Sequence, residues 1–200
     1  MRYLALGDSY TIGESVAETE RWPVQLAAQL RATGIPLENP VIIARTGWTT
    51  DELMAAIQRQ NPQGPFDLVS LLIGVNNQYR GRDSIEYRAQ FCTLLQTAVT
   101  LAGDKPGHVL VLSIPDWGVT PFAQGNDGPK IATEIDQFNA INHEETLQVG
   151  ARYVDVTPIS RQAAGDATLI AEDGLHPSGK MYRLWVELVE PVARAICNPI

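Results

Sequence analysis

The sequence predicts an α/β protein in which a parallel sheet carries helices on both faces. Short apolar segments alternate with longer segments of helical pattern along the chain. The short segments show no clean alternation of apolar and polar residues, which is typical of strands buried on both faces. Alternation of strand and helix implies right-handed crossovers between parallel strands.

Each expected strand is a short apolar run. The five strands are expected over residues 2–6, 41–44, 67–73, 108–114 and 153–156. In sheets of this class, ligands bind beyond the carboxyl ends of the strands. The residues directly after each strand are therefore the ones to search for a functional site.

The helices are indicated by their ends and by their apolar spacing. Pro23 lies near a helix start and Gly34 at its end, while Thr49 and Glu52 have the spacing of a capping box. Pro191 is expected to kink or end the last helix. The helices are expected over residues 22–34, 49–60, 84–102, 131–150 and 179–196.

Apolar residues spaced by three, four and seven predict the buried faces of the three longest helices. The expected buried positions are Ile85, Cys92, Leu95, Val99 and Ala102 in the first, Ile131, Ile135, Phe138 and Ile141 in the second, and Met181, Leu184, Leu188, Val192 and Ile196 in the third.

Length and composition favour one globular domain over residues 1–200. A chain of this size buries enough surface to fold without disulfides or metal. Cys92 and Cys197 form no metal motif; Cys92 is interpreted as a buried free thiol, with a disulfide between the two as the alternative.

The formal net charge of −8 argues against a nucleic-acid partner. Nucleic-acid binding needs clustered cations, so no nucleic-acid partner is expected. No apolar run approaches the roughly 18 residues needed to span a bilayer, and no signal-peptide pattern is present. The expected localisation is cytoplasmic, although a leader already removed would leave no trace. The oligomeric state is not indicated.

Ser9 follows the first strand in the stretch ALGDSYTIGE. A serine hydroxyl becomes a good nucleophile when a base takes its proton, so this hypothesis needs a histidine. His108 begins a strand and His143 lies in a helical pattern, and both are interpreted as structural or solvated. His176 lies in the loop EDGLHPSG, three residues after Asp173, which can orient the imidazole as a general base requires.

Two further loops supply candidate donors for an oxyanion. Gly47 follows the second strand, and a glycine lets its backbone N–H approach a ligand closely. Asn76 follows the third strand and has a neutral amide donor. Either residue alone is equally well explained as part of a turn.

Together, the segments GDSYTIGES, RTGWTT, IGVNN and DGLHPSG resemble the four sequence blocks of the SGNH hydrolases, also called the GDSL esterase/lipase family. The order matches, and the blocks extend from the first strand to the start of the last helix. Any one block is a weak signal, but four in order on a strand–helix frame are specific. The resemblance implies a flavodoxin-like three-layer α/β/α fold with a five-stranded parallel sheet.

The resemblance also implies residue roles. Ser9 would be the nucleophile, His176 the general base and Asp173 its orienting partner. The oxyanion hole would consist of the backbone N–H groups of Ser9 and Gly47 and the side chain of Asn76. Asn77 departs from the family pattern, which usually has Asp there; we expect altered local hydrogen bonding without loss of the oxyanion donor. Asp8 is expected to brace the turn.

The implied activity is hydrolysis of acyl esters through an acyl-enzyme, without metal or organic cofactor. The rate should rise from mildly acidic to neutral pH, because an unperturbed histidine has a pKa of about 6.5. A small or soluble ester is the favoured substrate, and a thioesterase, a carbohydrate deacetylase or a lysophospholipase would use the same residues. A flavin- or nucleotide-binding module and a binding protein without catalysis are the alternatives outside the enzyme class.

Three segments are candidates for the pocket. Residues 115–130, with Trp117 and Phe122, form a pocket wall, a lid or a packed surface loop. Tyr79, Arg80 and Arg82 either contact a polar or anionic head group or are solvated. Trp48 either lines the acyl pocket or packs under the helix.

Overall fold

The computed structural model describes residues 1–198 and contains a five-stranded parallel sheet. The strands lie in the order β2-β1-β3-β4-β5, and each neighbouring pair is parallel. Their bounds are β1 (Tyr3–Gly7), β2 (Val41–Ala44), β3 (Leu68–Leu72), β4 (Val109–Leu112) and β5 (Arg152–Val154). The five predicted strands and their parallel pairing are confirmed.

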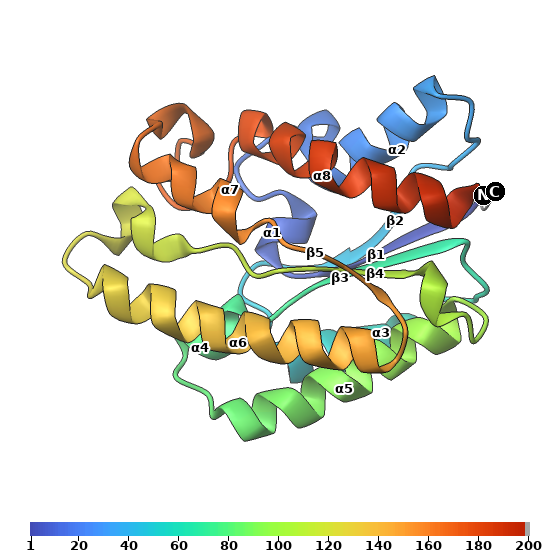
Figure 1. Cartoon of the computed structure of the whole chain (residues 1–200), viewed down its shortest axis with the longest axis horizontal. Helices are drawn as coiled ribbons and strands as arrows, with labels where there is room; N and C mark the ends of the chain where they lie inside the picture. The colour runs from blue at the N-terminus through green and yellow to red at the C-terminus, as the bar shows by residue number, and fades with distance from the viewer. Residues whose placement is uncertain (199–200) are drawn as a thin grey trace.

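Helices cover both faces of the sheet (Figure 1). On one face, α2 (Trp22–Ala32) packs along α8 (Gly179–Cys197). The other face carries α3 (Thr50–Gln60), α5 (Ser84–Leu101) and α6 (Gly128–Gln148). Three short helices occupy loops: α1 (Ser9–Ile12), α4 (Val75–Tyr79) and α7 (Thr157–Arg161). This is the flavodoxin-like three-layer α/β/α arrangement that the resemblance implied.

The central strands explain why their sequences are apolar without alternation. Every residue of β1, β3 and β4 is buried, because helices cover both faces. Burial of apolar surface stabilises the folded state by about 25 cal/mol per Å². Burial on both faces therefore makes the centre of the sheet a rigid support for the loops at its edges. The largest fully buried side chains lie in this sheet and in the helices that cover it: Trp22, Trp185, Tyr3, Tyr87, Tyr182 and Phe91.

Two predictions about helix ends have different outcomes. The capping box is present at the start of α3, where the Glu52 carboxylate accepts the Thr49 N–H at 2.9 Å. Pro191 was expected to kink or end the last helix; it does not end it, because α8 continues to Cys197. Pro191 is exposed, and a proline inside a helix leaves one carbonyl of the preceding turn without its backbone donor.

The predicted buried positions are all confirmed in α6 and only in part in α5 and α8, where Leu95, Val99, Ala102, Met181 and Ile196 are buried. Ile85 is 79% exposed and Leu188 is 44% exposed. The buried faces of these helices are set by aromatic side chains that the aliphatic pattern passed over: Tyr87 and Phe91 in α5, and Tyr182 and Trp185 in α8. Larger side chains bury more apolar area, so they determine the face that packs.

Cys92 and Cys197 are both free thiols, and each is only partly buried. The alternative of a disulfide between them is therefore wrong, and the burial expected for Cys92 is incomplete. Among residues 1–198, no helix is both long and apolar enough to cross a membrane.

Candidate active site

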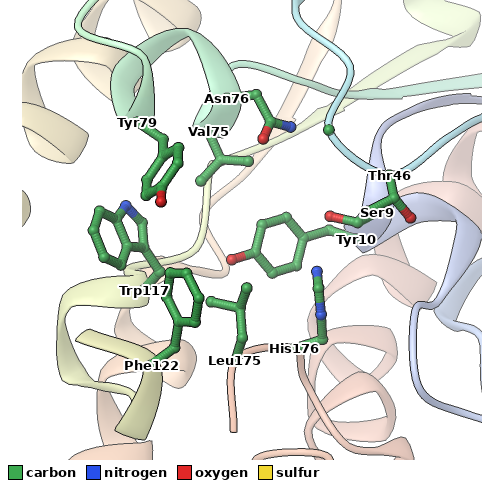
Figure 2. Close-up of a pocket in the computed structure, with 11 residues that line it drawn as sticks. Ser9, Tyr10, Thr46, Val75, Asn76, Tyr79, Trp117, Phe122, Leu175 and His176 are labelled. Atoms are coloured by element: carbon green, nitrogen blue, oxygen red, sulfur yellow. The ribbon is translucent and has the colours of Figure 1, made fainter. Parts of the chain in front are cut away.

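The predicted site residues meet at the carboxyl edge of the sheet. Ser9 begins α1 directly after β1, Asn76 lies on α4 after β3, and Gly47 lies in the loop after β2. His176 comes from the loop that precedes α8. These four residues line one pocket (Figure 2). The pocket lies at the carboxyl ends of β1 and β3, the two neighbouring strands from which the chain winds in opposite directions across the sheet.

The turn that carries Ser9 is tightly packed. A Cβ atom at Gly7 would lie 2.4 Å from the Leu72 carbonyl oxygen, so only glycine lets β1 end this close to β3. Asp8 is fully buried and accepts the Tyr10 N–H at 3.0 Å, which caps α1 as expected for a residue that braces the turn. Burial raises the pKa of the Asp8 carboxyl to about 7, with the Tyr10 hydrogen bond opposing the shift.

Asp173 and His176 form a close pair. The Nδ1 atom of His176 lies 2.5 Å from Oδ2 of Asp173, while Oδ1 of Asp173 accepts the backbone N–H groups of Leu175 and His176, each at 2.9 Å. The loop thus folds around its own carboxylate. Figure 2 shows the imidazole pointing toward the Ser9 hydroxyl.

The charge of Asp173 is held by hydrogen bonds. Burial alone would raise the pKa of this carboxyl, but the hydrogen bonds from the His176 ring, the two backbone N–H groups and Ser15 outweigh it. They hold the pKa well below its usual range. Asp173 is therefore a carboxylate at neutral pH, which favours a proton on the Nδ1 that faces it and leaves Nε2 free to accept one.

The three expected oxyanion donors surround the same space. The Ser9 N–H opens α1 and so has no partner within the helix. Gly47 has a φ of 85°, a left-handed conformation that favours glycine, and its carbonyl accepts Arg80 Nη2 at 2.6 Å. The Asn76 amide donates one N–H to the Trp48 carbonyl at 3.0 Å and has a second N–H to offer.

Asn77, where the family usually has Asp, faces away from the pocket lining. Its Oδ1 accepts the Thr50 N–H at 3.1 Å, and its Nδ2 donates to the Thr50 hydroxyl at 2.7 Å. The Thr50 hydroxyl in turn donates to Gln90. The Asn77 side chain is therefore paired with Thr50 and does not line the pocket.

Apolar side chains complete the pocket, whose volume is about 140 Å³. The 115–130 segment forms one wall. Trp117 is fixed by a 2.8 Å hydrogen bond from its Nε1 to Gln78, and the Phe122 N–H donates to the Gly174 carbonyl at 2.9 Å. The residues that line the apolar part are Tyr10, Val75, Tyr79, Trp117, Phe122 and Leu175.

Other candidates from the sequence lie outside the pocket. Arg80 forms an ion pair with Glu52 and Arg82 with Glu86, and both remain partly exposed beside the pocket, while Tyr79 lines it. Trp48 packs against the hydrophobic core instead of lining the pocket. His108 contacts the Asp67 carbonyl and His143 packs on Tyr153, away from Ser9.

Four pocket residues were not identified from the sequence: Tyr10, Thr46, Val75 and Leu175. Each adjoins or lies between residues that were identified. Their position in the sequence could have indicated them, because each directly precedes or follows a predicted site residue, and neighbours in a tight turn often line the same pocket. The Tyr10 ring, for example, lies 5.5 Å from the His176 ring, centroid to centroid.

A sequence model of the GDSL-like Lipase/Acylhydrolase family matches residues 5–184. The chain belongs to this family. It is a carboxylic ester hydrolase of the GDSL type, which agrees with the four sequence blocks. The alternatives of a flavin- or nucleotide-binding module and of a binder without catalysis are not supported. A comparison with curated proteins gave no match.

Several solved structures share the fold of this GDSL-type hydrolase. TesA superposes with a TM-score of 0.76 at 19% identity, covering 98% of this chain and 99% of that one. The lipase/acylhydrolase from Enterococcus faecalis gives a TM-score of 0.69 at 21% identity, covering 100% and 99%. The acetylxylan esterase Axe2 from Geobacillus stearothermophilus gives 0.71 at 19% identity, covering 96% and 93%.

Proposed function

We propose that this chain hydrolyses small carboxylic esters through an acyl-enzyme formed on Ser9. The observation that carries the proposal is convergence: Ser9, His176 and the expected oxyanion donors come from four separate loops, yet line one pocket. Asp173 lies directly behind His176. A serine, a base with its orienting carboxylate and donors for an oxyanion are the set that acyl transfer requires.

The proposed reaction proceeds in two halves. The Ser9 hydroxyl attacks the ester carbonyl carbon while Nε2 of His176 takes its proton. The N–H groups of Ser9, Gly47 and Asn76 stabilise the negative charge on the carbonyl oxygen. His176 then protonates the leaving alcohol, and the acyl group remains on Ser9. A water that gives its proton to His176 hydrolyses this acyl-enzyme, releases the acid and restores Ser9.

The pocket favours a short acyl group. Its volume of about 140 Å³ is close to that of an apolar cavity that holds one benzene ring, roughly 150 Å³. Tyr79 and Phe122 are half-exposed at this pocket, so an alcohol portion that extends toward solvent would lie against aromatic rings. An acetyl, propionyl or butyryl ester fits this space better than a long-chain lipid.

Thioesters, acetylated sugars and lysophospholipids are substrates that the same residues could process. The apolar lining and small volume favour a short acyl group in each case. Axe2, which shares the fold, is an acetylxylan esterase, so acetyl esters of sugars are a class to include in any substrate panel.

The test is a panel of p-nitrophenyl esters from acetate to palmitate, together with acetylated xylo-oligosaccharides, short-chain acyl thioesters and a lysophospholipid. Wild type is assayed beside Ser9→Ala and Ser84→Ala, which changes an exposed serine outside the pocket. We expect short esters to be hydrolysed by wild type and Ser84→Ala but not by Ser9→Ala. Equal activity in Ser9→Ala would contradict the proposal, and a preference for palmitate would contradict the assigned acyl size.

A further inference from the structure

Ser15 has a backbone conformation that serine rarely adopts. Its φ is 63°, in the left-handed region that favours glycine, and holding a side chain there costs on the order of 1 kcal/mol. Glycine would relieve this strain. A serine at this strained position is explained if its hydroxyl makes a contact that glycine could not make.

That contact is the carboxylate behind His176. The Ser15 hydroxyl donates to Oδ2 of Asp173 at 2.7 Å, across 158 residues of sequence. The same oxygen lies 2.5 Å from Nδ1 of His176. The other donors to Asp173 are its own neighbours Leu175 and His176, so Ser15 supplies the only donor from outside this loop among the hydrogen bonds of residues 1–198.

This hydrogen bond joins the two halves of the proposed triad. Ser15 lies six residues after Ser9, beyond the short helix α1. Within the described part of the chain, it is the one direct hydrogen bond between residues 8–16 and residues 166–178. Ser9 and the Asp173–His176 pair are otherwise related through packing, such as that of Tyr10 on His176.

The residue before Ser15 makes a second link. The Glu14 carboxylate accepts a hydrogen bond from the Thr46 hydroxyl, next to Gly47. The segment after α1 is therefore attached on one side to the loop with a proposed oxyanion donor and on the other to the loop with the proposed base. A strained residue at this junction fits a role in fixing the relative positions of these loops.

We infer that Ser15 is a positioning residue, whose hydroxyl fixes the Asp173–His176 pair relative to Ser9. This inference rests on the proposed function. Loss of the hydroxyl should leave substrate binding intact and slow the chemical step, because hydrogen bonding to a charged partner and correct placement of the base matter most in the transition state. The expected effect is a decrease in kcat of about tenfold, with KM within twofold of wild type.

The test compares Ser15→Gly and Ser15→Ala with wild type and Ser84→Ala. Ser15→Gly removes the hydroxyl and the strain together, so relief of strain offsets part of the lost hydrogen bond and this variant should unfold at a higher temperature than Ser15→Ala. Ser15→Ala removes the hydroxyl and keeps the strain. Equal decreases in kcat for both variants would assign the effect to the hydroxyl.

A second readout reports on the pair itself. The proton between His176 and Asp173 should give a downfield imidazole N–H signal in the proton NMR spectrum of wild type. We expect this signal to shift or broaden in both Ser15 variants and to remain unchanged in Ser84→Ala. A kcat within twofold of wild type would overturn the inference, as would a decreased kcat with an unchanged imidazole signal. Activity that survives in Ser9→Ala would instead refute the proposed function, and the NMR signal would still report on Ser15.

Discussion

Asn76 and Asn77 are neighbours in the chain, but their side chains serve different parts of the molecule. Asn76 lines the pocket and donates to the Trp48 carbonyl, whereas Asn77 exchanges two hydrogen bonds with Thr50 at the start of α3. Successive residues of a helix point about 100° apart, so the first turn of α4 places one amide in the pocket and the other in the protein interior.

Asn76→Ala should therefore affect catalysis. Removing one oxyanion donor typically lowers kcat by roughly 10²–10³. KM should change little, because the donor acts on charge that develops in the transition state. Steady-state kinetics on a short p-nitrophenyl ester would measure both constants. A variant with a kcat within threefold of wild type would show that Asn76 is no oxyanion donor.

Asn77→Ala should instead affect stability. Asn77 is 1% exposed, and its loss leaves the buried Thr50 N–H without an acceptor. We expect the free energy of unfolding to fall by about 1–3 kcal/mol. Urea denaturation gives this value, and kcat measured on the folded variant serves as the control. The account of Asn77 would be wrong if stability were unchanged while kcat fell as far as in Asn76→Ala.

Asp8 should make stability depend on pH. Burial raises its folded pKa to about 7, whereas in the unfolded chain it ionises near its ordinary value of about 3.9. Between these values the native state holds a proton that the unfolded state has lost, so the contribution of Asp8 to stability falls as pH rises from about 4 to 7.

The matched variant is Asp8→Asn, which keeps an oxygen for the Tyr10 N–H but does not ionise. Its stability relative to wild type should increase between pH 4 and 7, by up to about 1.4 kcal/mol per pH unit, and level off above pH 7. Urea unfolding of both proteins at each pH measures this difference. A constant difference across the range would exclude a raised pKa at Asp8.

Asp173→Asn should lower kcat without loss of fold. An amide in place of the carboxylate no longer stabilises the imidazolium or selects the proton on Nδ1, and equivalent changes in other triads lower kcat by roughly 10⁴. The control is Asp166→Asn, which removes an exposed partner of Lys180 near the same loop. Stopped-flow or steady-state assays would compare the two, and similar activities would argue against a role for Asp173 in orienting His176.

The sequence indicated the sheet and the motif residues because these depend on local signals. Apolar runs without alternation predicted buried parallel strands, and the carboxyl-end rule then directed attention to Ser9, Gly47 and Asn76. Ile85 in α5 and Leu188 in α8 were wrongly expected to be buried, because the choice between aliphatic and aromatic side chains for the buried face depends on the shape of the surface that each helix packs against. Local periodicity does not contain that information.

Contacts between distant loops also could not be predicted from the sequence. Ser15 and Asp173 are 158 residues apart, and nothing local marks them as partners. The same holds for Arg80, whose contacts with Gly47 and Glu52 join segments that are about 30 residues apart in the chain. Such contacts depend on how whole strands and helices are placed in the tertiary structure, so local sequence patterns do not predict them.

Covalent labelling of the nucleophile tests the proposed role of Ser9. Wild type, Ser9→Ala and Ser84→Ala are treated with a fluorophosphonate, and the intact masses and peptides are measured. We expect one adduct per chain, located on Ser9, in wild type and Ser84→Ala, and none in Ser9→Ala. An adduct of equal yield in Ser9→Ala, or one located on another residue of wild type, would contradict this role.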